Sequence, residues 1–129
     1  MRLDNEQTAL HRAVSAGTTE IINILLNHFA EVNAQDNEGR SPLHIACTAG
    51  NLNAAEAICQ RPNAQLNLVD DEGNSPMHCA CSSLQDDVIQ FLLNQKSCPV
   101  DLAIVNMHGK TPADVLQNKA KLAGQLTKF

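Results

Sequence analysis

The segment "HCAC", from His78 to Cys81, places an imidazole and two thiols that could bind a metal ion in one short stretch. On a helix, however, side chains at positions i, i+1 and i+3 do not all converge on one point. A tetrahedral zinc site would also need a second C-x-x-C or H-x-x-x-H pair, which the sequence lacks. We therefore expect no metal ion and no cofactor.

The sequence also lacks a recognisable set of catalytic residues. The sequence contains no Walker, Rossmann, H-E-x-x-H or G-x-S-x-G signature, and no paired carboxylates in an apolar surround. The glycine-containing stretches "DNEGR" (36–40) and "DDEGN" (70–74) have the composition of turns rather than of phosphate-binding loops. We predict no catalytic residue and no enzymatic activity.

The composition argues against whole classes of partner. The chain has 129 residues, 43 % of them apolar, a formal net charge of −5, and neither Trp nor Tyr to stack on bases. Residues 1–106 carry five Lys and Arg against thirteen Asp and Glu, which argues against nucleic-acid binding. No apolar run approaches the roughly 20 residues of a membrane helix, and the N-terminus lacks a signal peptide. We expect a soluble intracellular monomer, cytoplasmic and/or nuclear, without membrane insertion.

A motif recurs along the chain at a nearly constant spacing. "TALH" begins at Thr8, "SPLH" at Ser41, "SPMH" at Ser75 and "TPAD" at Thr111, with separations of 33, 34 and 36 residues. Self-similarity at this period indicates a stack of small units, because one unit cannot bury its apolar face alone.

Each motif predicts the start of a helix. A Ser or Thr hydroxyl caps free backbone N–H groups, and Pro tolerates the first helical position. We predict a first helix near residues 42–49, ended by Gly50, and then a second helix with one apolar face, exemplified in the first unit by Ile21, Ile22, Leu25 and Leu26. Polar loops rich in Asn, Asp and Gly precede the next cap.

The five cysteines fit this scheme as small buried side chains. Their number is odd and no secretory signal is present, so a disulfide framework is not expected. Cys47 and Cys81 occupy equivalent positions in neighbouring units. Stacked helices lie about 8 to 10 Å apart, whereas a disulfide needs Cα atoms within roughly 7 Å, so this pair should stay reduced.

"NEGRSPLHIACTAGN", with "AEVNAQD" before it, resembles the ankyrin repeat family over nearly the whole chain. The resemblance implies an all-α solenoid of about four stacked helix-turn-helix units with β-hairpin finger loops, the last unit truncated or capping. It also implies one domain, 1–129, with repeats near 3–35, 36–69, 70–105 and 106–129. His11, His44 and His78 would then be structural, each hydrogen-bonding with its Ser or Thr to lock adjacent repeats.

Departures from the family pattern mark particular positions. Leu84 stands where a glycine ends the first helix of the other repeats, and Asp114 replaces the histidine of the fourth motif. Glu6 replaces the finger glycine of the first repeat, and "KSCPV" (96–100) lengthens the third. Atypical terminal repeats are expected as caps.

The resemblance assigns partner contacts to the finger loops and to the exposed faces of the first helices. It implies a protein-protein interaction module, an adaptor or targeting domain. Because Glu38, Asp71 and Glu72 form an acidic row on the fingers, we expect its partner to carry a basic patch. Two alternatives remain open: a small inhibitor of a kinase or transcription factor, and the ankyrin segment of a larger enzyme or channel. The expected contact residues are Asn37, Glu38, Arg40, Thr48, Ala49, Asp71, Glu72, Asn74, Ser82, Ser83, Met107, His108 and Lys110.

Overall fold

The computed structural model describes residues 7–28, 30–95 and 99–118. Six helices follow in order: α1 (Ala9–Ala16), α2 (Thr19–Asn27), α3 (Pro42–Ala49), α4 (Leu52–Cys59), α5 (Pro76–Ser82) and α6 (Asp86–Leu93). A further helical segment covers 112–118. No helix among the described residues is long and apolar enough to span a bilayer. Glu6 of the first finger, Cys98 and the chain after residue 118 lie outside the described residues.

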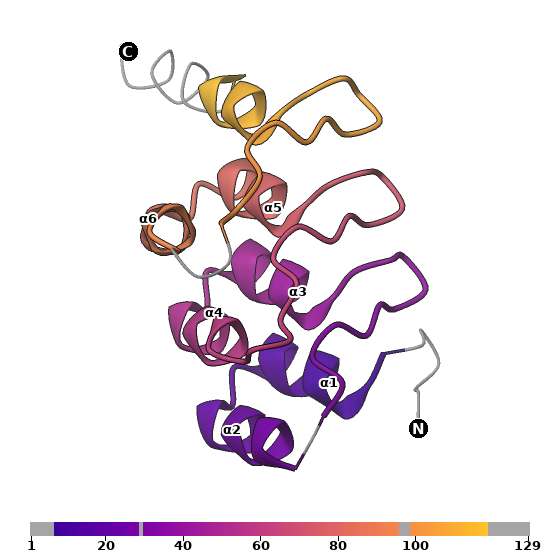
Figure 1. Ribbon diagram of the computed structural model, residues 1–129, viewed down its shortest axis with the longest axis vertical. Helices are drawn as coiled ribbons and strands as arrows, with labels where there is room; N and C mark the ends of the chain where they lie inside the picture. Colours follow the sequence, from indigo (N-terminus) through magenta and orange to yellow (C-terminus); the bar gives the residue numbers. More distant parts are fainter. Residues whose placement is uncertain (1–6, 29, 96–98, 119–129) are drawn as a thin grey trace.

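The helices form two stacked rows. Figure 1 shows α1, α3 and α5 in one row, here called the inner helices, and α2, α4 and α6 in a second, outer row. Helix α3 packs against α1, α4 and α5, so consecutive pairs share one continuous interface. Three loops project from the inner side in parallel, as Figure 1 shows. The predicted all-α solenoid of stacked helix pairs is confirmed.

The inner helices begin and end as their sequences predict. Ser41 caps α3: the His44 backbone N–H donates to Ser41 Oγ at 3.4 Å, and the Ser41 N–H donates to His44 Nδ1 at 3.1 Å. The same reciprocal box opens α1 and α5. At the other end, Gly50 adopts φ 70° and Leu84, its equivalent, adopts φ 53°. The departure noted at Leu84 is therefore a substitution of the residue without a change of backbone path.

Each finger loop (36–40, 70–74 and 106–110) is a tight turn closed by its own first residue. The Asp36 N–H donates to the Arg40 carbonyl at 2.9 Å, and Asp36 Oδ1 accepts from the N–H groups of Glu38 and Arg40 at 2.9 Å. Asp70 and Asn106 repeat this pattern.

Neighbouring finger loops are joined by single backbone bonds, Asp71 N–H to Glu38 O at 3.0 Å and Met107 N–H to Glu72 O at 2.9 Å. A lone bond between successive loops does not build a ladder, and the described residues contain no strand. The expected β-hairpins are therefore turns.

The interior is aliphatic and finely packed. Ala46, Cys47, Ala54 and Ala55 are all 0 % exposed, which lets the helices of consecutive repeats approach closely. Cys47, Cys59, Cys79 and Cys81 are free thiols, as predicted. Burial raises the pKa of Cys81 to about 11, so this thiol stays protonated and acts as a small apolar side chain.

The predicted apolar face of the second helices is wrong in one respect. Ile22 is fully buried in α2, but Ile21 is 47 % exposed, whereas its counterparts Ala54 and Val88 are 0 % and 1 % exposed. Helix α4 packs against both α2 and α6, whereas α2 packs against α4 alone among the outer helices that the structure describes. The first position of the pair faces the preceding repeat, so α2 leaves it open.

The backbone at Leu84 predicts a stabilising substitution. A branched residue at positive φ costs of order 1 kcal/mol, and the Leu84 side chain is 41 % exposed, so little packing is lost on its removal. We expect Leu84→Gly to raise the free energy of unfolding by about 1 kcal/mol in urea titrations.

The matched control is Gly17→Ala, at φ 75°, where an added Cβ would meet nothing closer than Asn51 Nδ2 at 3.9 Å. It should lower the stability by a similar amount, because only backbone strain changes. A loss of stability in Leu84→Gly would mean that the leucine side chain contributes more than its backbone costs.

Candidate partner-binding surface

Each inner helix carries one buried histidine, and that histidine bonds to the finger loop of the next repeat. Because Nδ1 of His44 accepts from the Ser41 N–H, its ring proton lies on Nε2, which donates to the Asn74 carbonyl. The other two histidines repeat both bonds. The Nε2 to carbonyl distances are 2.8 Å for His11 to Arg40, 2.8 Å for His44 to Asn74 and 2.9 Å for His78 to Lys110. The predicted structural role is confirmed, and the inter-repeat bond belongs to Nε2 rather than to the Ser-His pair.

Asp114, which stands where the other repeats have histidine, makes the hydrogen bonds of the helix cap but, within the described part of the chain, no bond to a further loop. Its Oδ2 accepts from the Thr111 N–H at 3.0 Å and its own N–H donates to Thr111 Oγ1 at 3.2 Å, so the helix cap is complete. The hydrogen bond from the Thr111 N–H to the carboxylate is the largest cause that lowers the pKa of Asp114. A carboxylate has no proton to donate to a further loop, so the bridge from helix to next loop needs the histidine of the other repeats.

One cluster of potential metal ligands arises from this packing. His44, Asp70 and Cys79 bring donor atoms within 4.8 Å of one another. Both nitrogens of His44 are already engaged, and Asp70 Oδ1 accepts from the Glu72 and Asn74 N–H groups. Burial raises the pKa of the Cys79 thiol to about 11. Binding a metal would break the joint between two repeats, so we assign no metal site to it.

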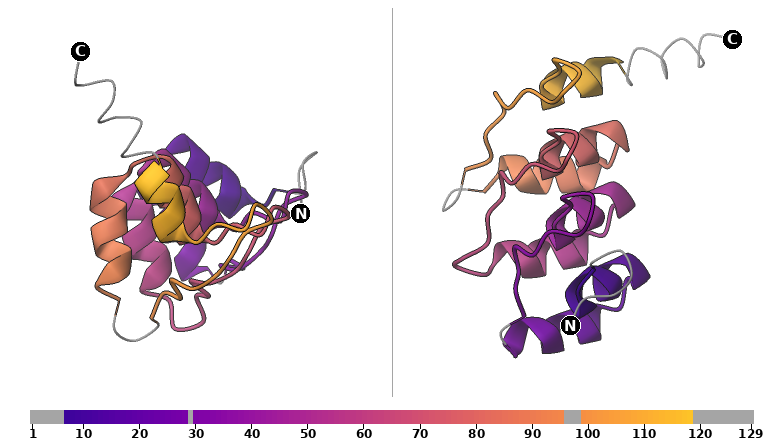
Figure 2. Two further views of the ribbon diagram at one scale, coloured as in Figure 1. Left: turned by 90° about the horizontal axis from the view of Figure 1, so that it is seen from above. Right: turned by 90° about the vertical axis from the view of Figure 1, so that its right-hand side faces the viewer.

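The expected contact residues lie on one side of the molecule. Viewed along the stack, the finger loops extend to one side of the inner helices, while the outer helices lie behind (Figure 2). Arg40, Asn74 and Ser83 are half-buried. The other ten are exposed: Asn37, Glu38, Thr48, Ala49, Asp71, Glu72, Ser82, Met107, His108 and Lys110.

Six of these residues come together around one hollow of about 300 Å³, which we call the finger hollow. Its lining also includes His78, Cys79, Asn106 and Val115. The six predicted residues in it are Thr48, Glu72, Asn74, Ser82, Ser83 and His108. Ala49 and the remaining finger residues lie outside this lining, so the expected contact residues are partly gathered and partly spread along the stack.

In the finger loop 36–40, a buried carboxylate fixes the position of a positively charged side chain. Asp36, with a fully buried side chain, pairs with Arg40 Nε at 3.1 Å, while exposed Glu38 lies 3.7 Å from the same nitrogen. Burial raises the pKa of Asp36, but the Arg40 and Glu38 N–H groups, Gln7 and the Arg40 charge outweigh it and lower the pKa overall. Asp36 therefore stays ionised and fixes the guanidinium.

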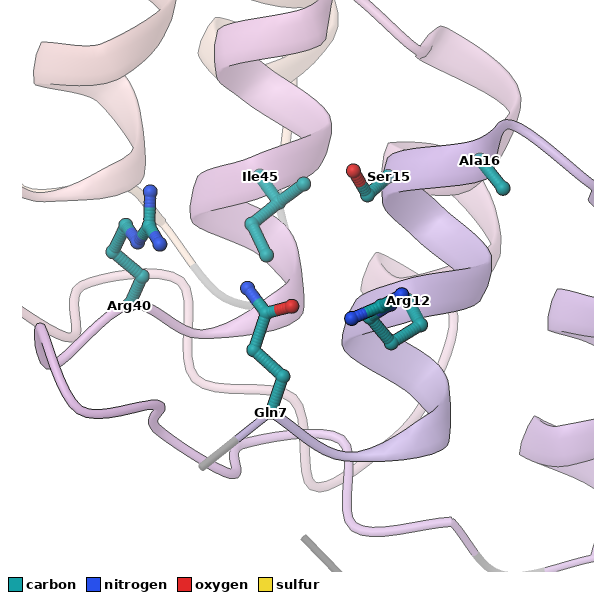
Figure 3. A pocket seen from close by; sticks show the side chains of 6 residues that line it. All are labelled: Gln7, Arg12, Ser15, Ala16, Arg40 and Ile45. Atoms are coloured by element: carbon teal, nitrogen blue, oxygen red, sulfur yellow. The ribbon is translucent and has the colours of Figure 1, made fainter. Parts of the chain in front are cut away.

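A second hollow joins Arg40, one of the expected contact residues, to Gln7, Arg12 and Ile45, which sequence reasoning missed. It measures about 470 Å³ and is called the basic hollow; its lining is Gln7, Arg12, Ser15, Ala16, Arg40 and Ile45. Figure 3 shows Arg12 and Arg40 on either side of Gln7 and Ile45. Arg12 follows His11 just as Ile45 follows His44, so aligning the repeats would have placed it on the inner face.

Comparison with known proteins agrees with the repeat architecture. The family described as "Ankyrin repeats (3 copies)" matches residues 1–70, and a single "Ankyrin repeat" matches residues 72–103. The chain is 41 % identical to Rabankyrin-5 from Mus musculus over 59 residues, which is 46 % of this chain and 5 % of that protein.

Two further relatives match shorter stretches. BCL-6 corepressor-like protein 1 from Homo sapiens is 51 % identical over 45 residues, 35 % of this chain and 2 % of that protein. NF-kappa-B inhibitor alpha from Gallus gallus is 39 % identical over 54 residues, 42 % of this chain and 17 % of that protein. The chain thus spans a small part of the length of each relative.

The bridge made by His44 predicts that acid weakens the fold. Burial has the largest effect on His44 and lowers its pKa. The hydrogen bond to the Asn74 carbonyl and the charge of Asp70 act in the opposite direction, because they favour the charged form of the ring. Below about pH 6.5 the unfolded chain then binds more protons at this group than the folded chain, so the free energy of unfolding falls. We expect urea titrations to show lower stability at about pH 5.5 than at about pH 7.5.

His44→Asn isolates this group, because Asn keeps an acceptor for the Ser41 N–H but is too short to reach Asn74. It should cost about 1–3 kcal/mol near pH 7.5 and reduce the pH dependence. His28→Asn changes an exposed histidine and should leave both unchanged. Equal pH dependence in wild type and His44→Asn would contradict the assignment.

Proposed function

Because the chain belongs to the ankyrin repeat family, we propose that it is a non-enzymatic module that binds another protein through its finger loops and inner-helix faces. The observation that carries the proposal is the finger hollow, where six expected contact residues line one open depression. They come from helix α3, the finger loop 70–74, helix α5 with its cap residue Ser83, and the finger loop 106–110. Solenoids commonly bind proteins on such a surface.

The geometry supports protein binding more than small-molecule binding. Apart from Ala49 and Met107, the exposed contact residues are polar or charged, and the finger loops are held to the helices by the three histidine bridges. A surface that is rigid before binding loses little conformational freedom when a partner docks.

The acidic finger row supports a partner with a basic patch. Glu38, Asp71 and Glu72 are all exposed. Rim contacts of this kind are worth about 0.2–1 kcal/mol each and weaken with salt, so they contribute to the association rate more than to affinity. The affinity is assigned to close packing on the small residues of α3 and α5.

An adaptor or targeting role is the form of the proposal that we favour. The names of two relatives describe an inhibitor and a corepressor-like protein. A small inhibitor of a kinase or transcription factor is therefore the second form, and the ankyrin segment of a larger enzyme or channel is the third. For the adaptor and inhibitor forms we propose an intracellular, cytoplasmic or nuclear monomer that binds no nucleic acid and does not insert into a membrane.

Two double variants test the surface. A protein captured by affinity pull-down and identified by mass spectrometry serves as the partner, and binding is followed by surface plasmon resonance. Glu38→Lys with Glu72→Lys should mainly slow association. Ala49→Arg with Ser83→Arg should abolish binding, because bulky side chains there block close approach. All four side chains are exposed or half-buried, so both variants should melt at the wild-type temperature.

The matched control places the same charge on the outer row. Asn23→Arg with Gln90→Arg alters exposed positions of α2 and α6 and should leave binding unchanged. If this control abolishes binding while the inner-helix variant binds normally, the interface lies on the outer helices and the proposal fails.

A further inference from the structure

The basic hollow concentrates positive charge on an otherwise acidic chain. Residues 1–106 contain five Lys and Arg, and two of these, Arg12 and Arg40, line this one depression. The remaining lining is neutral: Gln7, Ser15, Ala16 and Ile45. The finger hollow in the next repeats has the opposite character, since its lining includes Glu72 and no Lys or Arg.

Arg40 is held ready for a ligand. Its Nε is bound to the buried Asp36 carboxylate at 3.1 Å, and its backbone N–H donates to the same side chain. Among the residues that the structure describes, the two Nη groups have no partner, and the side chain is 37 % exposed. A guanidinium fixed by one carboxylate can therefore present its outer N–H groups without first being ordered.

Arg12 supplies a second cation from the other wall. It is exposed on α1, and its side chain forms no hydrogen bond or ion pair within the described part of the chain. Figure 3 shows its guanidinium turned toward the side of the hollow where Gln7 lies. Arg40 has ion pairs with Asp36 and Glu38, whereas Arg12 has none with any residue that the structure describes.

We propose that the basic hollow binds an Asp or Glu side chain of the protein partner. A carboxylate is the planar anion that guanidinium groups recognise through paired hydrogen bonds, and Ile45 offers the acid's methylene groups an apolar contact. This inference rests on the proposed function and adds the chemistry of the partner. The partner segment is then polarised: an acidic residue lies over α1 and α3, and a basic residue lies over the finger hollow.

The repeat spacing sets the separation of these two residues. Stacked helices lie about 8–10 Å apart, and the two hollows are one to two repeats apart, so an extended segment at about 3.3 Å per residue spans them in about three to six residues. The geometry therefore points to a linear segment with an acidic and a basic residue at that separation.

The test is selection from a phage-displayed library of random linear peptides on the intact chain. Wild type should enrich peptides with an acidic residue about three to six positions from a Lys or Arg. A fluorescently labelled synthetic copy of the strongest peptide then serves as the probe in anisotropy titrations. Arg12→Gln should weaken it about fivefold, and an Asp→Asn or Glu→Gln copy of the peptide should lose the same factor and bind both proteins equally.

Arg61→Gln is the matched control, because it removes the same charge from the outer side, where Arg61 donates to Asn27. It should leave the affinity unchanged. Selected peptides without acidic enrichment, or an equal loss in Arg61→Gln and Arg12→Gln, would overturn the carboxylate site while leaving the proposed function standing. Failure to select any peptide that competes with the captured protein would overturn both.

Discussion

A neutral imidazole that donates from Nε2 to the carbonyl of the following loop is the constraint on which this structure depends. Each histidine accepts at Nδ1 from the cap of its own helix, so one ring joins the start of a helix to the loop of the next repeat. The bond requires a buried, uncharged side chain with one donor and one acceptor. Histidine is the residue that provides both from one rigid ring.

The arrangement of the candidate binding surface follows from these histidine hydrogen bonds. Because the finger loops are tied to the inner helices at their bases and to one another by single backbone bonds, their tips remain exposed at fixed positions. Small buried residues such as Ala46 and Ala54 let the repeats stack closely, and the loops then border two hollows of different charge. The chain thus converts one repeated sequence into a surface whose chemistry changes along its length.

Much of the fold could be predicted because its signals are local. Ser41 and Pro42 predict a helix start, and alignment of Leu84 with Gly50 identifies a residue in the left-handed conformation. The exposure of Ile21 could not be predicted, because it depends on whether another helix covers that face. The missing strands depend on the number of bonds between finger loops, which composition does not reveal.

The site was predictable in part for the same reason. Thr48 and Ser82 recur in register, whereas the basic hollow joins Arg12 and Arg40 through tertiary packing.

The most direct test of the central claim is hydrogen–deuterium exchange on the chain with and without its captured partner. Protection should concentrate in the finger loops 36–40 and 70–74 and in α3 and α5. Protection confined to α2, α4 and α6 would contradict the account.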